Sequence, residues 1–316
     1  MFVVMMTLFA IVVVGYAAGK MGYMGGDFDK KLSSLVINWT CPALILSSSM
    51  TGELPDRRFI LPLLGISTLT YIVLTALAFW LPRFLTRRKE DEGIVGFALM
   101  FGNVGFMGYP VVASIFGHEA IFYAAVLNVV NTFTVFTVGT ILIAGKSGGA
   151  SLTDSTDSPV MGRRFQKKVL YSSPMLAAYL TMLIVALEID NIPEVISSPL
   201  AMIGNITVPA ALLIVGSSMS QLSLRALLGN TTVYATTVLR LAIIPLAVHL
   251  LCTLLGFAPF VVGINTVVIA MPVATYGTIL CLKYGRDTTL IAEVTFITTV
   301  LSMLSIPLLV MVLNQH

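Results

Sequence analysis

The sequence predicts an all-α polytopic membrane protein with ten transmembrane helices in two inverted five-helix repeats. Hydrophobic residues make up 57% of the 316 residues and charged residues only 10%, whereas about a quarter of a soluble domain is charged. The mean hydropathy is +0.95. Ten apolar segments are each close to the ~20 residues that cross a bilayer. One polar stretch separates the first five segments from the last five.

The expected membrane segments follow one another through short connections. The longest connection, residues 145–167, is rich in Ser, Thr, Asp and Gly, which is typical of a flexible linker, and we expect it to be cytoplasmic. It divides the chain into a first repeat at 1–144 and a second at 168–316. The ten segments span residues 2–20, 31–51, 59–81, 93–116, 119–144, 168–188, 195–219, 230–256, 260–283 and 287–312.

Matching Asn and Pro patterns indicate that the two halves are related. Segment two contains Asn38-Trp-Thr-Cys-Pro42, and segment seven contains Asn205-Ile-Thr-Val-Pro209. Pro110 in segment four and Pro272 in segment nine form a second matched pair. Because each half has an odd number of segments, the second half enters the membrane from the opposite side. The halves therefore form an inverted repeat.

The prolines of segments four and nine mark interruptions inside apolar segments. They lie in Phe101-Gly-Asn-Val-Gly-Phe-Met-Gly-Tyr-Pro-Val111 and in Ile269-Ala-Met-Pro-Val-Ala-Thr-Tyr-Gly277. We expect a new half-helix to begin at each proline, because Pro suits the first turn of a helix. Two crossed, broken helices with their positive ends at one cavity favour an anion, most simply a carboxylate. The alternative is a pair of ordinary proline kinks satisfied by neighbouring helices.

Candidate substrate contacts follow from these two interruptions. The Asn103 amide can orient a carboxylate, or it can satisfy carbonyls of the broken helix. Asn38 and Asn205 either line the same cavity or form hydrogen bonds between helices. The residues that we predict to contact substrate are Asn103, Gly105, Gly108, Tyr109, Pro110, Pro272, Thr275, Tyr276, Asn38 and Asn205.

Three ionisable residues inside the segments are candidates for coupling or charge balance. A charge in the middle of segment eight costs at least ~2.5 kcal/mol, so Arg240 should face protein or water. Arg240 either balances an anionic substrate or pairs with Glu293 in segment ten. His249 is either a satisfied buried histidine or a proton-coupling group. We expect no cofactor and no metal site, because three scattered histidines form no ligand set; coupling to sodium or to protons stays open.

The distribution of Lys and Arg predicts the orientation. Apart from Arg57, Arg58 and Arg240, every Lys and Arg lies in a connection that follows an odd-numbered segment or at the edge of that connection. Cytoplasmic loops carry such an excess, so both termini should be extracytoplasmic, in the cell's inner membrane. Cys41, Cys252 and Cys281 fall in apolar segments, where we expect buried thiols and no disulfide.

Several other classes of protein are disfavoured. The sequence has no G-x-x-x-x-G-K-[ST] motif for a nucleotide-driven pump and no G-x-S-x-G motif of a hydrolase. The net charge of +3 does not indicate a nucleic-acid partner. An anion-conducting channel would need a continuous ring of polar side chains, and a membrane-embedded sensor or enzyme would need convergent ionisable groups. We therefore expect a transporter and not an enzyme.

Taken with these motifs, the sequence resembles the auxin efflux carrier family, the prokaryotic relatives of the plant PIN carriers, over essentially its whole length. The stretch from Gly102 to Pro110 looks like the family's crossover in span four, and Met271-Pro-Val-Ala274 looks like the crossover in span nine. Two further segments are similar to family segments: Pro209-Ala-Ala-Leu-Leu-Ile-Val-Gly216 and Ser302-Met-Leu-Ser-Ile-Pro307.

The resemblance implies a fold, a mechanism and a substrate class. Spans one, two, six and seven would form a scaffold, and spans three to five and eight to ten a mobile transport domain. The carrier would work by elevator-type alternating access, as a homodimer joined through its scaffolds. Asn103 matches the family's carboxylate-binding asparagine, and the substrate would be a small organic anion such as an auxin-like or dicarboxylic acid. The short central connection and Asn38-Trp39 differ from the plant members.

Overall fold

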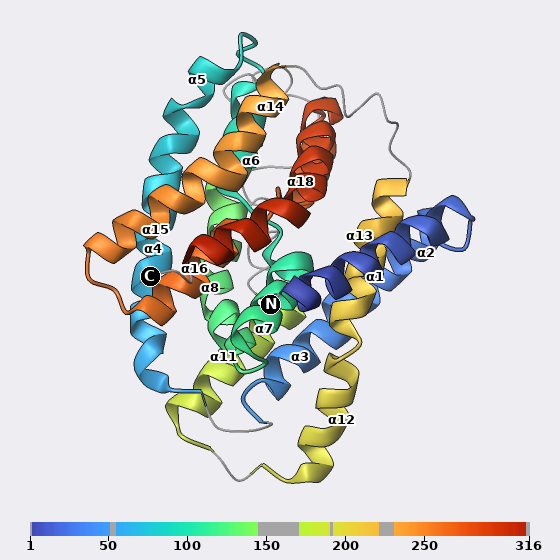
Figure 1. The fold of residues 1–316 in the computed structure, drawn as a ribbon, viewed down its shortest axis with the longest axis vertical. Helices are drawn as coiled ribbons and strands as arrows, with labels where there is room; N and C mark the ends of the chain where they lie inside the picture. Colours follow the sequence, from blue (N-terminus) through green and yellow to red (C-terminus); the bar gives the residue numbers. More distant parts are fainter. Residues whose placement is uncertain (1, 51–54, 145–170, 190–191, 221–230, 314–316) are drawn as a thin grey trace, which may run out of the picture.

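The structure is a computed structural model that describes residues 2–50, 55–144, 171–189, 192–220 and 231–313. The predicted linker at 145–167 lies outside these residues. Helices dominate the first half (Figure 1), with bounds α1 Phe2–Lys20, α2 Gly26–Leu35, η1 Val36–Thr40, α3 Cys41–Ser47, η2 Arg57–Phe59, α4 Ile60–Trp80, α5 Pro82–Leu85, α6 Glu92–Met100, η3 Val104–Gly108, α7 Tyr109–Phe116, α8 Ala120–Thr134, η4 Val135–Gly139 and α9 Thr140–Ala144.

The second half is helical in the same way. Its helices are α11 Ser173–Ala186, α12 Glu194–Gly204, α13 Thr207–Ser220, α14 Thr231–Val238, η6 Leu239–Ile243, α15 Ile244–Leu254, α16 Pro259–Ile269, α17 Tyr276–Lys283 and α18 Thr289–Leu313. These helices are apolar around most of their circumference, as expected where lipid and protein share the surface. A helix also satisfies its own backbone hydrogen bonds in hydrocarbon.

The helical class predicted from the sequence is confirmed. Five described helical stretches are long and apolar enough to cross a membrane: Arg57–Trp80, Ala120–Ala144, Glu194–Ser220, Thr231–Leu254 and Thr289–Met311. Shorter apolar helices occupy Met6–Lys20, Val104–Phe116, Ser173–Ala186 and Pro259–Ile269. Each of the ten expected segments contains at least one helix. The chain is therefore a multi-pass helical membrane protein, and the ten crossings and the inverted repeat stay predictions.

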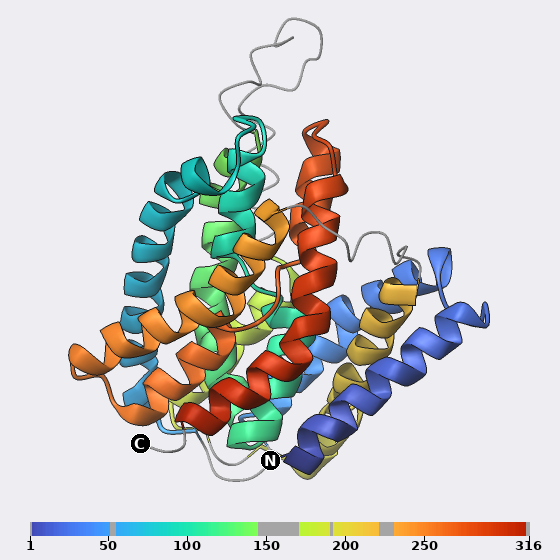
Figure 2. The ribbon, with the colours of Figure 1, turned by 45° about the horizontal axis from the view of Figure 1, so that its top comes forward.

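Two groups of helices pack within the molecule. In one, α1 lies along α13, and α3 contacts both α11 and α12 (Figures 1 and 2). In the other, α4 contacts α6, α8 and α16, while α18 packs against α14 and α6. Each group combines helices from both halves of the chain. The division of these helices into a scaffold and a mobile transport domain stays a prediction.

Small residues bring α1 and α13 into close contact. A Cβ atom built on Gly15 would overlap the backbone of Leu213, so only glycine permits this approach. Gly15 and Gly19 form a small-xxx-small motif, and in this structure the motif packs within the chain. The neighbouring helix α2 is fixed to α13 by a buried hydrogen bond in which the Ser217 hydroxyl donates to the Asp29 carboxylate at 2.7 Å.

Three π-helical turns stand immediately before a proline-containing first turn. The turns η1, η3 and η6 precede helices that have Pro42, Pro110 and Pro245 as their second residue. A proline has no N–H, and its ring clashes with the carbonyl four residues earlier in a regular α-helix. A π turn widens the helix at that place, so the chain passes each proline without a break.

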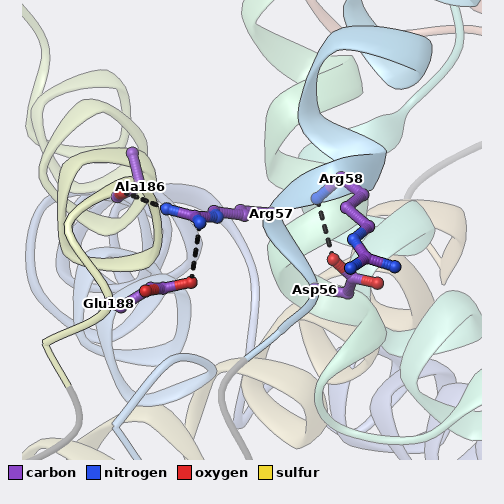
Figure 3. Close-up of polar contacts among 5 residues, drawn as sticks. All are labelled: Asp56, Arg57, Arg58, Ala186 and Glu188. Atoms are coloured by element: carbon purple, nitrogen blue, oxygen red, sulfur yellow. Dashed lines mark hydrogen bonds and ion pairs between the residues drawn. The ribbon is translucent and has the colours of Figure 1, made fainter.

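Exposed polar contacts join the beginning of α4 to the end of α11 (Figure 3). The Arg57 guanidinium lies 3.1 Å from the Glu188 carboxylate and donates to the Ala186 carbonyl at 3.5 Å. The Asp56 carboxylate accepts from the Arg58 N–H at 2.8 Å and so caps η2. The contacts of Arg57 connect the two helix groups at one edge of the molecule.

Candidate functional site

Two interrupted helices meet in the interior of the molecule. Helix α6 ends at Met100, α16 ends at Ile269, and the residues that follow each of them are extended or irregular. Gly102 and Val273 form an antiparallel bridge. The Asn103 N–H donates to the Pro272 carbonyl at 2.7 Å, and the Ala274 N–H donates to the Phe101 carbonyl at 3.0 Å. Each interruption thus satisfies backbone groups that the other exposes.

The first interruption lies earlier in the chain than the sequence analysis placed it. The new half-helix begins at Val104 and includes Pro110 as the second residue of α7. Asn103 caps it, with its side-chain Oδ1 accepting from the Phe106 N–H at 3.3 Å. The expectation that a half-helix begins at Pro110 was wrong, because the π turn η3 lets the helix continue through the proline.

The second interruption is also displaced from its proline. Pro272 lies inside the extended segment, and α17 begins only at Tyr276. The Pro272 carbonyl is the acceptor for Asn103, and the next residue, Val273, donates its N–H to the Thr298 hydroxyl of α18 at 3.2 Å. Pro272 therefore belongs to the contact between the two interruptions. Because proline has no N–H, it adds no backbone donor that would need a partner there.

Arg240 of η6 joins both interruptions. Its side chain is 0% exposed, its Nε donates to the Met271 carbonyl at 3.1 Å, and a terminal nitrogen donates to the Leu99 carbonyl at 3.0 Å. These carbonyls lie at or just beyond the C-terminal ends of α16 and α6, where the helix dipole favours a cation. Arg240 and Glu293 form no ion pair within the described part of the chain.

A cavity of about 370 Å³ lies beside the bridge. Its walls come from η1 and α3, the first interruption with η3, helices α8 and η4, the start of α11, and α17. Most of the wall is apolar, and the described lining residues include no Asp, Glu, Lys, Arg or His. The polar residues of the lining are Asn103, Tyr109, Asn128, Asn131, Thr132, Ser172 and Tyr276.

A chain of hydrogen bonds leads to this cavity from behind it. The Tyr71 hydroxyl donates to Asn131 Oδ1 at 2.7 Å, Asn131 Nδ2 donates to Asn128 Oδ1 at 2.9 Å, and Asn128 Nδ2 donates to the Tyr109 hydroxyl oxygen at 3.0 Å. Every donor in the chain points toward Tyr109. Because Tyr109 accepts from Asn128, its own O–H is left to donate to a ligand.

The structure brings part of the predicted contact set together. Asn103, Gly105, Tyr109 and Tyr276 line the cavity. A Cβ atom built on Gly105 would meet nothing within 4 Å, so this residue faces open space. The grouping shows that the two interruptions contribute to one cavity, and contact with substrate stays a prediction for each residue.

Other predicted residues lie outside the cavity wall. Gly108, Pro110 and Pro272 are buried in the packing around it, and Thr275 is exposed. Asn38 is exposed and donates to the Ser34 carbonyl at 2.9 Å within its own helix. The remaining three lie elsewhere: Asn205 is exposed at the end of α12, His249 is 3.3 Å from the Thr266 hydroxyl, and Glu293 lies partly exposed on α18.

Asn128 and Asn131 were missed by the sequence analysis. They lie three residues apart on α8, so their side chains share one face of the helix. Two amides on one face of an apolar segment are a usable signal, because buried amides in hydrocarbon need partners. The same signal would have indicated the hydrogen-bond chain but not its direction.

Interrupted helices that hold a partly polar cavity inside an otherwise apolar helical chain define a membrane transport protein. The comparison with known families agrees, because residues 1–310 match the family described as "Membrane transport protein". The chain belongs to this family, the auxin efflux carrier family.

Relatives over the full length are also named as transporters. An "Uncharacterized transporter" of Methanothermobacter thermautotrophicus is 27% identical over 309 residues, which cover 96% of this chain and 95% of the relative. A second protein so named, from Methanocaldococcus jannaschii, is 26% identical over 310 residues and 96% of each chain. A "Putative malonate transporter" of Rhizobium meliloti is 28% identical over 144 residues, or 44% of each chain.

Proposed function

We propose that this protein is a secondary active transporter of a small organic anion, which it binds through a carboxylate in the cavity beside the Gly102–Val273 bridge. The observation that carries the proposal is the start of the η3–α7 half-helix, which opens on the cavity at Asn103 and Gly105. A helix N-terminus offers N–H donors and the positive end of a dipole.

Asn103 is suited to orient the carboxylate. Its Oδ1 is occupied by the Phe106 N–H. Its Nδ2 has no hydrogen-bond partner within the described part of the chain, so it can donate to an anion. The Tyr109 hydroxyl supplies a second donor to the same space. Two neutral donors at a helix N-terminus bind an anion without placing a charged side chain in the wall.

The substrate is a small carboxylic acid, either auxin-like or dicarboxylic. Cavities that hold small molecules range upward from about 300 Å³ and combine apolar walls with a few placed polar groups. The cavity here has about 370 Å³ and such a wall. A dicarboxylate has a counterpart among the relatives, since the partial match is named a malonate transporter.

The lining of the cavity supports an opening toward the cytoplasm. Its lining runs from the bridge to Ser172, at the start of α11, which follows the Lys- and Arg-rich central connection. Both termini are then extracytoplasmic, in the inner membrane. Transport proceeds by elevator-type movement of α4–α9 and α14–α18 against a scaffold of α1–α3 and α11–α13, which forms the homodimer, with sodium or proton coupling.

Asn103 provides the sharpest test of this function. The purified protein is first screened by thermal shift against malonate, malate, phenylacetate and indole-3-acetate, with and without sodium, because a bound ligand raises the apparent stability. Uptake of each stabilising acid is then measured in proteoliposomes. We expect Asn103→Asp to keep the helix cap but lose binding by about 10- to 100-fold, since a hydrogen bond to a charged group is worth about 1.5–3 kcal/mol.

Asn103→Ala removes both the cap and the donor, and we expect it to lose transport as well. Asn38→Ala, on an exposed amide outside the cavity, serves as the matched control for Asn103→Ala, and it should transport normally because it adds no charge to a membrane segment. The proposal is wrong if no acid of the panel is bound or taken up by the wild-type protein, or if Asn103→Asp transports as well as the control.

A further inference from the structure

We propose that Arg240 is the positioning residue of the two interruptions and that its charge makes the adjoining cavity selective for anions. The inference rests on the proposed transport of an organic anion and assigns the source of its charge selectivity. No charged side chain occurs among the described lining residues. Beyond the partial charge of the η3–α7 N-terminus, any full positive charge that favours an anion therefore has to lie behind the wall, and Arg240 is a cation placed there.

The hydrogen bonds of Arg240 reach both interrupted helices. Arg240 donates to Leu99, in the last turn of α6, and to Met271, just past the end of α16. One guanidinium thus binds backbone from both interrupted helices, which belong to different halves of the chain. The planar, forked donor set of arginine suits two acceptors at fixed positions, whereas a lysine offers one ammonium point charge.

The two hydrogen bonds use Nε and Nη1 of Arg240 and leave Nη2 without an acceptor. One terminal nitrogen of Arg240 is buried and has no hydrogen-bond partner. It lies against Gly102, because a Cβ atom built on Gly102 would overlap it. Gly102 also lines the cavity. A backbone without a side chain is therefore all that separates the guanidinium from the bound anion.

The charge of Arg240 also changes the electrostatic potential at the cavity. The C-terminal ends of α6 and α16 carry negative partial charge, and Arg240 offsets both. The positive N-terminal end of the η3–α7 half-helix then faces the cavity, and the negative ends of α6 and α16 no longer weaken its potential there. Since Arg240 is 0% exposed, its interaction with an anion is weakly screened by water and by salt. A neutral ligand of the same shape gains nothing from this charge.

Substitutions at two positions separate the charge from its placement. Arg240→Met removes the charge with similar length, and Arg240→Lys keeps the charge with fewer donors. Gly102→Ala keeps the arginine but displaces its terminal nitrogen. Gly65→Ala is the control for an added methyl group, because Gly65 of α4 lies outside the cavity lining and its Cβ atom would meet nothing within 4 Å.

The first measurement needs no ligand. Hydrogen exchange of the full-length protein in detergent reports on the bridging amides of Asn103 and Ala274. We expect Arg240→Met to exchange these amides at least tenfold faster, with the rest of the described helices unchanged. Arg240→Lys should give an intermediate rate, because one ammonium group cannot reproduce both hydrogen bonds, and Gly65→Ala should exchange these amides at the wild-type rate. Unchanged protection in Arg240→Met overturns the positioning role.

The second measurement compares an anion with a neutral isostere. Dissociation constants are measured for phenylacetate and phenylacetamide, and for malonate and malonamide. We expect the preference for the acid over the amide to fall at least tenfold in Arg240→Met and in Gly102→Ala. Arg240→Lys and Gly65→Ala should keep the preference for the acid, and in the wild type this preference should change little between low and high salt. A preference that persists in Arg240→Met overturns the charge role.

The outcomes also separate this inference from the proposed function. If the wild type binds neither acid pair, the proposed carboxylate transport is what fails, and hydrogen exchange alone decides the role of Arg240. If Arg240→Met does not fold, the comparison of Gly102→Ala with Gly65→Ala decides both points, since both variants retain the arginine. Equal exchange and equal acid preference in those two variants overturn the proposal.

Discussion

At the scale of single residues, the site depends on which polar groups remain available after the protein has satisfied its own backbone. Buried polar groups in an apolar interior need hydrogen-bond partners. In the chain from Tyr71 to Tyr109, each amide uses a donor and an acceptor internally, and every bond points the same way. Such aligned bonds polarise one another and strengthen the final donor. Tyr109 is therefore the place where the chain can act on a ligand.

Tyr109→Phe tests this role. The change removes the hydroxyl and leaves Asn128 Nδ2 without its acceptor, so we expect a loss of stability of about 1–3 kcal/mol. Loss of the donor should also raise the KM for the transported acid about tenfold, with kcat less affected. Thermal unfolding and proteoliposome uptake measure the two effects.

Tyr123→Phe is the matched control, because the Tyr123 hydroxyl accepts from the Asp56 N–H at 2.8 Å, outside the cavity lining. It should cost stability without changing KM. Similar KM values for the two variants would show that Tyr109 contributes packing and structure but no ligand contact.

At the scale of helical elements, the π turn η3 decides where Asn103 points. In this turn the Gly108 N–H donates to the Asn103 carbonyl, five residues back. Pro110 prevents the regular alternative, since it has no N–H to donate to the carbonyl of Phe106. Closing the π turn to an α turn would rotate the residues before it by about 100°, the step of one residue. Pro110 thus sets the orientation of Asn103, the N-cap residue about two turns earlier in the chain.

Pro110→Ala is expected to keep the fold and lose transport. An alanine restores the missing donor and favours closure of η3, which turns the Asn103 amide away from the cavity. Pro259→Ala is the control, because Pro259 begins α16 without a π turn before it. Both variants should resemble the wild type in thermal unfolding, while only Pro110→Ala loses uptake. Normal uptake by Pro110→Ala would mean that η3 does not set the orientation of Asn103.

The sequence predicted the elements better than their interruptions. Long apolar segments become helices in any arrangement, so each of the ten expected segments contains helix, and the ten crossings stay a prediction. The exact break was missed because Pro110 is conspicuous in sequence, whereas Gly102 and Asn103 interrupt the helix only through contacts with Val273 and Arg240 in the other half of the chain. Those contacts depend on tertiary structure. The same reason explains why the partners of Arg240 are backbone carbonyls and not the Glu293 carboxylate.

At the scale of the whole molecule, the central question is whether the two helix groups move against each other. The Arg57–Glu188 ion pair connects the start of α4 in one group with the end of α11 in the other (Figure 3). Both side chains are more than half exposed, at 54% and 63%. Exposed pairs contribute about 0–1 kcal/mol. This contact can therefore break and form again during transport without a large barrier.

Cross-linking of this contact tests the movement. A short bis-thiol cross-linker joins Arg57→Cys to Glu188→Cys in a variant whose buried Cys41, Cys252 and Cys281 are replaced by Ser or Ala. If α4 and α11 belong to bodies that shift by several ångströms, the linked protein should bind the acid and fail to transport it. A cleavable linker should restore uptake after cleavage, and each single-cysteine variant treated with the linker should transport normally. The short covalent link prevents the start of α4 and the end of α11 from separating. Full uptake by the linked protein would therefore mean that transport does not require these two helices to move apart, and it would place them in one rigid body.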